Sequence, residues 1–262
     1  MRTVLLEVLL FYIALGLYGL FFSEGLIFQP RPSSYREIAN SARLKLTSAD
    51  GSSISAVYLL NPLATHTLLF SHGNAEDLET VGPFLQILRN IGFSVLSYDY
   101  PGYGSSTGKV SEKGAYAAVD AAYHYLIHDL KLSPQSIIAH GRSLGGGVAA
   151  DLASRHEVGG LILESTFLSA YRVMTRFSLY PFDAFNTYAK LKNIKSKVLV
   201  IHGKLDEVIP FYHGEQLFAK LKDTNQAEVP LWIDNAHHND IWAIAPEAYI
   251  AALKEFKALC CK

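Results

Sequence analysis

Cysteine is almost absent from this sequence. The chain has two, Cys260 and Cys261, which are adjacent near its C-terminus. A pair of neighbouring cysteines offers neither the spacing of a disulfide framework nor the ligands of a cysteine-rich metal site. We interpret this end as a tail with two free thiols. Lipidation is the alternative, because acylation and prenylation also use cysteines near a terminus.

An excess of charge of one sign is lacking too. Lysine and arginine number 23 against 24 aspartates and glutamates, a formal net charge of −1. Nucleic acids are normally bound by a basic face, so no nucleic-acid partner is expected. Charged residues make up only 18% of the 262-residue chain and hydrophobic ones 50%. Such a composition is typical of a globular protein with a large buried sheet.

One long hydrophobic run is present at the N-terminus. Residues 3–22 (TVLLEVLLFYIALGLYGLFF) are almost continuously apolar, with one acid, Glu7. About 20 such residues can cross a hydrocarbon core, so we predict residues 1–23 as the transmembrane anchor of a single-pass membrane protein. A cleaved signal peptide is the alternative, although its basic region would be Arg2 alone and no A-x-A site follows. Arginines flank the run on both sides, which leaves its orientation open.

Residues 24–40 are rich in proline and serine and are predicted to be a linker. From residue 41 to residue 262, strand and helix patterns alternate without an internal repeat. Strands are predicted at 43–47, 54–60, 66–70, 93–98, 136–140, 161–164, 198–202 and 230–233, and helices at 77–90, 111–130, 144–156, 212–221 and 246–259. This alternation predicts an α/β fold, a mostly parallel eight-stranded sheet with an antiparallel beginning and helices on both faces.

A nucleophile motif lies between the strand at 136–140 and the helix at 144–156. Gly141 and Gly145 flank Ser143 in a G-x-S-x-G pattern, and the strand–turn–helix context is that of a nucleophile elbow. A second match centres on Ser106. A loop separates that serine from the preceding strand and no helix follows at once, so we interpret it as part of a glycine-rich surface loop.

An acid and a base follow Ser143 in the order that such folds use. A serine hydroxyl needs a base to take its proton, and that base needs an orienting acid. Asp206 lies just beyond the strand at 198–202, and His237 and His238 follow the strand at 230–233. Spacing alone does not choose between the two histidines.

An oxyanion hole is expected from two backbone N–H groups. One belongs to Leu144, directly after the nucleophile. The other belongs to Asn74, in the H-G-N-A loop that follows the strand at 66–70.

The remaining histidines are assigned to structure. His124 and His128 are four residues apart on a helix, a spacing compatible with a metal, but no third ligand is in sight. His202 is interpreted as a packed histidine. Asp99 and Tyr100 are expected to shape the loop or the pocket. We expect neither a metal nor an organic cofactor.

The ordered motifs HGNA, YDYPGYGSSTG, HGRSLGGGVA, ESTF, HGKLDEVIPF and HHND resemble the α/β-hydrolase superfamily. More narrowly, they resemble the membrane-associated abhydrolase-domain serine hydrolases, a branch that includes protein depalmitoylases. The resemblance implies a catalytic domain over residues 41–262 with Ser143, Asp206 and His238 as its triad. His237 stands where the family has a glycine. The depalmitoylases of this branch carry an N-terminal cysteine-rich segment that this chain lacks.

The predicted reaction is two-step hydrolysis of a carboxylic ester or thioester through an acyl-enzyme. A lipid-like acyl substrate is favoured because residues 166–192, the predicted short lid, are rich in aromatic side chains: Phe167, Tyr171, Phe177, Tyr180, Phe182, Phe185 and Tyr188. These could line an acyl groove or simply pack a helix onto the sheet. A serine peptidase and a non-catalytic binding protein of the same fold are the alternatives.

Overall fold

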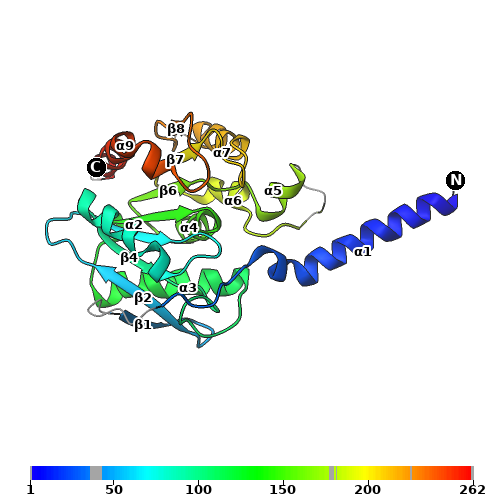
Figure 1. Cartoon of the computed structure of the whole chain (residues 1–262), viewed down its shortest axis with the longest axis horizontal. Helices are drawn as coiled ribbons and strands as arrows, with labels where there is room; N and C mark the ends of the chain where they lie inside the picture. Colours follow the sequence, from blue (N-terminus) through cyan, green and yellow to red (C-terminus); the bar gives the residue numbers. More distant parts are fainter. Residues whose placement is uncertain (1, 36–42, 177–179, 181, 225, 261–262) are drawn as a thin grey trace.

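An eight-stranded sheet forms the centre of the molecule (Figure 1). The computed structural model describes residues 2–35, 43–176, 180, 182–224 and 226–260. Its strand order is β1-β2-β4-β3-β5-β6-β7-β8. The strands are β1 (Arg43–Thr47), β2 (Ser53–Leu59), β3 (Thr67–Ser71), β4 (Ser94–Tyr98), β5 (Ile137–Arg142), β6 (Gly160–Glu164), β7 (Lys197–Gly203) and β8 (Leu231–Ile233). The pairs β1–β2 and β2–β4 are antiparallel and the rest are parallel, which confirms the predicted sheet.

Helices cover both faces of this sheet. The long ones after the first are α2 (Leu78–Ile91), α3 (Glu112–His124), α4 (Leu144–Arg155), α7 (Tyr212–Lys222) and α9 (Pro246–Leu259). Apolar side chains of α3, α4 and α7 share one core cluster, and those of α2 and α9 share another. Alternate residues of β5 enter opposite clusters, because successive side chains of a strand point to opposite faces. Both faces of the central strands are therefore buried, which explains their unbroken apolar runs.

The predicted helix at 111–130 is present, but only its first part is α-helical. Ser111 caps the N-terminus of α3 by accepting a hydrogen bond from the N–H of Gly114. After His124 the chain continues as a π-helical turn, η1 (Tyr125–Asp129). Short helical pieces complete the fold: η2 (Pro134–Ser136), α5 (Ala170–Thr175), α6 (Thr187–Lys190), η3 (Leu191–Asn193) and α8 (Ile241–Ile244).

The N-terminal apolar run forms a helix, α1 (Arg2–Ile27), that projects from the domain (Figure 1). Among the residues that the structure describes, no helix is sufficiently long and apolar to cross a membrane. The predicted transmembrane anchor at 1–23 is therefore not supported. An apolar run shows that a segment is hydrophobic but does not show whether lipid or protein covers it. Part of α1 contacts the domain, because the Tyr171 hydroxyl donates to the carbonyl oxygen of Gly19 at 3.0 Å.

The chain after α1 returns to the domain at once. Phe28 is 3% exposed and packs edge-on against Tyr103 and Phe185, at ring-centroid distances of 6.4 and 5.7 Å. The helix thus runs into the predicted linker at 24–40, of which residues 36–40 lie outside the described residues. At the other end of the chain, Cys260 is half-buried, and Cys261 lies outside the described residues.

Candidate active site

Ser143 occupies a strained turn between β5 and α4. Its φ and ψ are 53° and −119°, a backbone conformation that non-glycine residues rarely adopt. The turn is possible because its neighbours lack side chains. A Cβ on Gly141 would lie 2.1 Å from the carbonyl oxygen of Gly145, and a Cβ on Gly145 would lie 2.0 Å from that of Ser71. The two glycines of the motif are therefore required by close backbone contacts.

Three of the predicted residues are joined in one chain of hydrogen bonds. His238 Nε2 lies 3.0 Å from Ser143 Oγ, and His238 Nδ1 lies 2.8 Å from Asp206 Oδ2. Asp206 follows β7 and His238 follows β8, so the ends of neighbouring parallel strands bring them together. His237 faces away: its Nδ1 lies 3.0 Å from Glu207 Oε2, and both side chains are exposed. The structure places His238, and not His237, beside Ser143.

Asp206 is buried and strongly held as an anion. Burial by itself raises the pKa of this carboxyl, but hydrogen bonds from His202 and His238 and from the N–H of Ile209 outweigh it and lower the pKa below its usual range. The carboxylate is ionised at neutral pH. It therefore favours a proton on the His238 Nδ1 that faces it, which leaves the lone pair of Nε2 directed at Ser143.

His202 is packed in the interior, as the sequence predicts, and it also contacts Asp206. It is fully buried, and its Nε2 lies 3.2 Å from Asp206 Oδ2 and 2.9 Å from the carbonyl oxygen of Ile209. The carboxylate of Asp206 thus has two histidine partners. The spacing of four residues across the end of β7 was the only trace of this contact in the sequence.

The two expected oxyanion residues line the same pocket as Ser143. Leu144 begins α4, so its N–H lies at the positive end of a helix. The Asn74 side chain is held by the end of α1 and the segment after it: its Nδ2 donates to the carbonyl oxygen of Ile27 at 2.6 Å, and its Oδ1 accepts from the N–H of Gln29 at 3.0 Å. The N-terminal segment therefore holds the loop that carries Asn74 in place.

An ion pair that the sequence analysis missed ties this loop to the nucleophile turn. Glu76 accepts a hydrogen bond from the N–H of Gly73 at 2.7 Å and pairs through its other oxygen with Arg142. The Arg142 guanidinium also lies 5.1 Å from the centre of the Phe84 ring. Arg142 occupies a variable position of the G-x-S-x-G pattern and Glu76 lies outside any motif, so no sequence signal marked the pair.

Asp99 and Tyr100 contact the loop that carries Asn74, consistent with the expectation that they shape the loop or the pocket. The Tyr100 hydroxyl donates to the carbonyl oxygen of His72 at 2.7 Å. Asp99 accepts from the N–H of Leu78 at 3.0 Å and lies 3.5 Å from His72 Nε2.

The other motifs and histidines lie elsewhere. The Ser106 hydroxyl is buried in a turn, where it donates to the carbonyl oxygen of Asp99 at 3.0 Å and accepts from the N–H of Ser55 at 2.9 Å. His124 and His128 are exposed. Within the described part of the chain, no group of three or more histidine, cysteine or acidic side chains could hold a metal ion.

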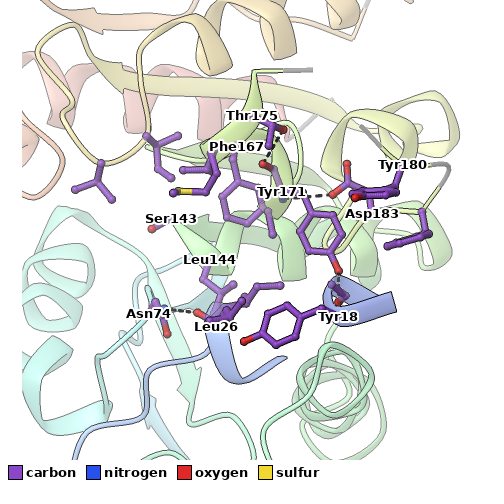
Figure 2. A pocket seen from close by; sticks show the side chains of 18 of the residues that line it. Tyr18, Leu26, Asn74, Ser143, Leu144, Phe167, Tyr171, Thr175, Tyr180 and Asp183 are labelled. Carbon is purple, nitrogen blue, oxygen red and sulfur yellow. Dashed lines mark hydrogen bonds between the residues drawn. The ribbon is translucent and has the colours of Figure 1, made fainter. Parts of the chain in front are cut away.

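A mainly apolar pocket of about 480 Å³ opens beside Ser143 (Figure 2). Four of the predicted lid aromatics line it: Phe167, Tyr171, Tyr180 and Phe182. Phe185 is fully buried in the core instead, and Tyr188 packs against that core. Phe177 lies outside the described residues. Part of the aromatic set thus lines the pocket beside Ser143, and part packs into the core.

Comparison with known proteins agrees with this geometry. The chain is 40% identical over 228 residues to alpha/beta hydrolase domain-containing protein 17C of Xenopus laevis, which covers 85% of this chain and 71% of the relative. The chain belongs to the α/β-hydrolase domain-containing family of serine hydrolases. It is also 44% identical over 199 residues to protein 17C of Mus musculus, covering 74% of this chain but only 60% of the mouse protein.

Further matches cover the two halves of the domain and its fold. Residues 64–181 match the family model of serine aminopeptidase S33, and residues 164–259 match that of the prolyl oligopeptidase family. The structure superimposes on a Pyrococcus furiosus esterase with a TM-score of 0.76, at 18% identity, covering 90% of this chain and 98% of the esterase. The chain is thus a hydrolase of the α/β type.

Proposed function

We propose that this chain is a serine esterase or thioesterase that hydrolyses substrates with an apolar acyl group. The observation that carries the proposal is the hydrogen-bonded series Ser143–His238–Asp206 at the edge of an apolar pocket. A base aligned on a serine can generate a nucleophile, and an apolar pocket beside it can hold an acyl chain.

The proposed reaction has two steps. His238 takes the proton of Ser143 as its Oγ attacks the carbonyl carbon, and the N–H groups of Leu144 and Asn74 hold the oxyanion. The tetrahedral intermediate collapses to an acyl-enzyme, and the alcohol or thiol leaves with the proton from His238. Water then attacks the acyl-enzyme by the same route, which releases the acid and frees the serine. Asp206 orients His238 and stabilises its charged form throughout.

A serine peptidase is the second candidate. The matches to the serine aminopeptidase and prolyl oligopeptidase family models favour it, because the same triad cleaves amides. A non-catalytic binding protein of this fold is the third candidate, and inactivity of a folded chain would favour it.

The test measures turnover by the full chain on a p-nitrophenyl ester, an acyl-thioester and an aminoacyl p-nitroanilide. We expect ester or thioester hydrolysis to fall by at least about 10³-fold in Ser143→Ala, as for removal of other serine nucleophiles. Ser106→Ala is the matched control and should retain activity if folded. Faster cleavage of the anilide would favour the peptidase, and equal activity of wild type and Ser143→Ala would refute the proposal.

Association with a lipid surface is a separate proposal. The large apolar side chains of the first half of α1 are between 46% and 70% exposed: Val4, Leu5, Leu6, Val8, Leu9, Leu10, Phe11 and Ile13. Because consecutive helical residues are 100° apart, these side chains point in every direction around the helix. Such a helix has no polar face to present to water, and contact with lipid would remove part of its apolar surface from water.

Flotation with phosphatidylcholine vesicles tests this association. We expect the full chain to float with the vesicles and a variant with both Leu6→Glu and Leu10→Glu to stay behind. Leu63→Glu, at an exposed site on the domain, is the control and should float. Wild-type chain that remains in the protein fraction would contradict the proposal.

A further inference from the structure

The N-terminal helix forms part of the wall of the pocket beside Ser143. Residues of its second half and its C-terminus line the cavity: Leu15, Tyr18, Gly19, Leu26 and Ile27. Figure 2 shows Ser143 on one side of the pocket and Tyr18 on another, with the lid aromatics between and beyond them. The helix α1, which is far from the catalytic residues in sequence, therefore bounds one side of the space that a substrate would enter.

Several contacts hold α1 against the rest of the pocket. On the lid side, the Tyr180 ring stacks on the Tyr12 ring with centroids 4.7 Å apart, and its hydroxyl donates to the Tyr12 carbonyl oxygen at 3.0 Å. Next to it, the Tyr171 hydroxyl donates to the carbonyl oxygen of Gly19 (Figure 2). On the oxyanion side, Asn74 bonds the carbonyl oxygen of Ile27. The helix thus forms hydrogen bonds both with the lid and with the loop that carries Asn74.

The chemistry of this space suits an aliphatic chain. Aliphatic and aromatic side chains from α1 and from the lid form most of its lining. The carboxylate of Asp183, which also lines it, is already engaged by the N–H groups of Tyr171 and Ala184. Burial of each methylene in such a site contributes about 0.8 kcal/mol, which is about a fourfold gain in affinity.

We propose that α1 sets the acyl-chain length that the enzyme accepts. The acyl group of an ester or thioester lies between α1 and the lid, and its distal carbons pass Gly19. This inference rests on the proposed function and adds to it a residue that determines specificity.

A substitution of Gly19 tests the proposal most directly. Gly19 lines the pocket, and a Cβ built there meets nothing within 4 Å, so we expect a larger side chain at this position to extend into the cavity. Gly25 lies in the same helix and also has open space at its Cβ, but it is exposed and does not line the pocket. Gly19→Leu and Gly25→Leu therefore both replace a glycine of α1 by a better helix former and differ in what they do to the pocket.

The first experiment measures kcat/KM of the full chain on p-nitrophenyl esters from acetate to palmitate. We expect Gly19→Leu to lower kcat/KM for the long esters by at least about 10-fold, equivalent to the loss of roughly two buried methylenes. Acetate turnover should stay within about twofold, and Gly25→Leu should match wild type throughout. Gly19→Ala should give a smaller loss of the same kind. An unchanged chain-length profile, or an equal loss for all esters, would overturn the proposal.

A binding measurement separates this inference from the proposed activity. Calorimetric titration of Ser143→Ala with dodecanoate needs no turnover. We expect binding that Gly19→Leu weakens at least fivefold and Gly25→Leu does not. If wild type hydrolyses no ester but this difference is found, the proposed function fails and the acyl pocket stands. If dodecanoate does not bind, or binds all variants alike, the inference fails whatever the activity.

Discussion

Replacement of Phe28 by alanine should cost the protein about 3–5 kcal/mol of unfolding free energy, the usual range for a buried phenylalanine. Phe28 follows α1 directly and is 3% exposed, with Tyr103 and Phe185 against its ring. Its removal leaves a cavity where the N-terminal segment meets the domain core. At about 2–4 °C per kcal/mol for a chain of this size, the melting temperature should fall by roughly 6–20 °C.

Urea unfolding of the full chain, followed by circular dichroism, measures this loss. Leu63→Ala serves as the control: Leu63 is 92% exposed, so its unfolding free energy should change by less than about 0.5 kcal/mol. A loss below about 1 kcal/mol in Phe28→Ala would refute the packing of the N-terminal segment on the domain. The wall that α1 contributes to the pocket would then lose its support.

Three further predictions concern the active site and its surroundings. His238→Ala should lower kcat by at least about 10³-fold, whereas His237→Ala should stay within about threefold, as ester turnover will show; the reverse would reassign the base. Gly145→Ala should lower the melting temperature and abolish activity, because its Cβ would meet backbone 2.0 Å away, whereas Gly82→Ala, with open space in α2, should be neutral or stabilising by up to about 1 kcal/mol. Burial lowers the pKa of His213 to about 4, so between pH 6.5 and 4 the unfolded chain binds a proton that the native one does not. His213 should therefore contribute a fall in stability of up to about 1.4 kcal/mol per pH unit as the pH is lowered through this window, and urea unfolding should show a smaller slope in His213→Gln.

The sheet and the nucleophile turn were predictable because local sequence determines both. A strand buried on both faces must be apolar throughout, so the predicted strand at 136–140 lies within two residues of β5 (Ile137–Arg142) at either end. The glycines around Ser143 are required by backbone contacts within the motif and with the adjacent β3. Burial of a strand and close backbone contacts at a turn can therefore be predicted from one sequence, as an apolar run and as conspicuously placed glycines.

The choice between His237 and His238 could not come from spacing. The two are neighbours in one loop, and their side chains diverge, one to the exposed Glu207 and the other to the buried Asp206. The resemblance to a family selected His238 where residue order could not. Only the positions of the partner side chains show why the two histidines differ.

Contacts between distant segments account for most of what the sequence did not show. Glu76 and Arg142 are 66 residues apart, and no sequence pattern around either residue predicts its contact with the other. The apolar run of α1 predicted a membrane span, yet its second half lines the pocket. Hydrophobicity alone does not distinguish lipid, a substrate chain and a protein surface as the partner of a helix.

Labelling of the full chain with a fluorophosphonate probe tests the central claim most directly. An aligned triad should react at Ser143, and mass spectrometry of the digested protein should find the adduct on that residue and not on Ser106. Labelling should be lost in His238→Ala, because the base would no longer take the proton of Ser143. A folded wild-type chain that does not react, or that carries the adduct on another residue, would contradict the account.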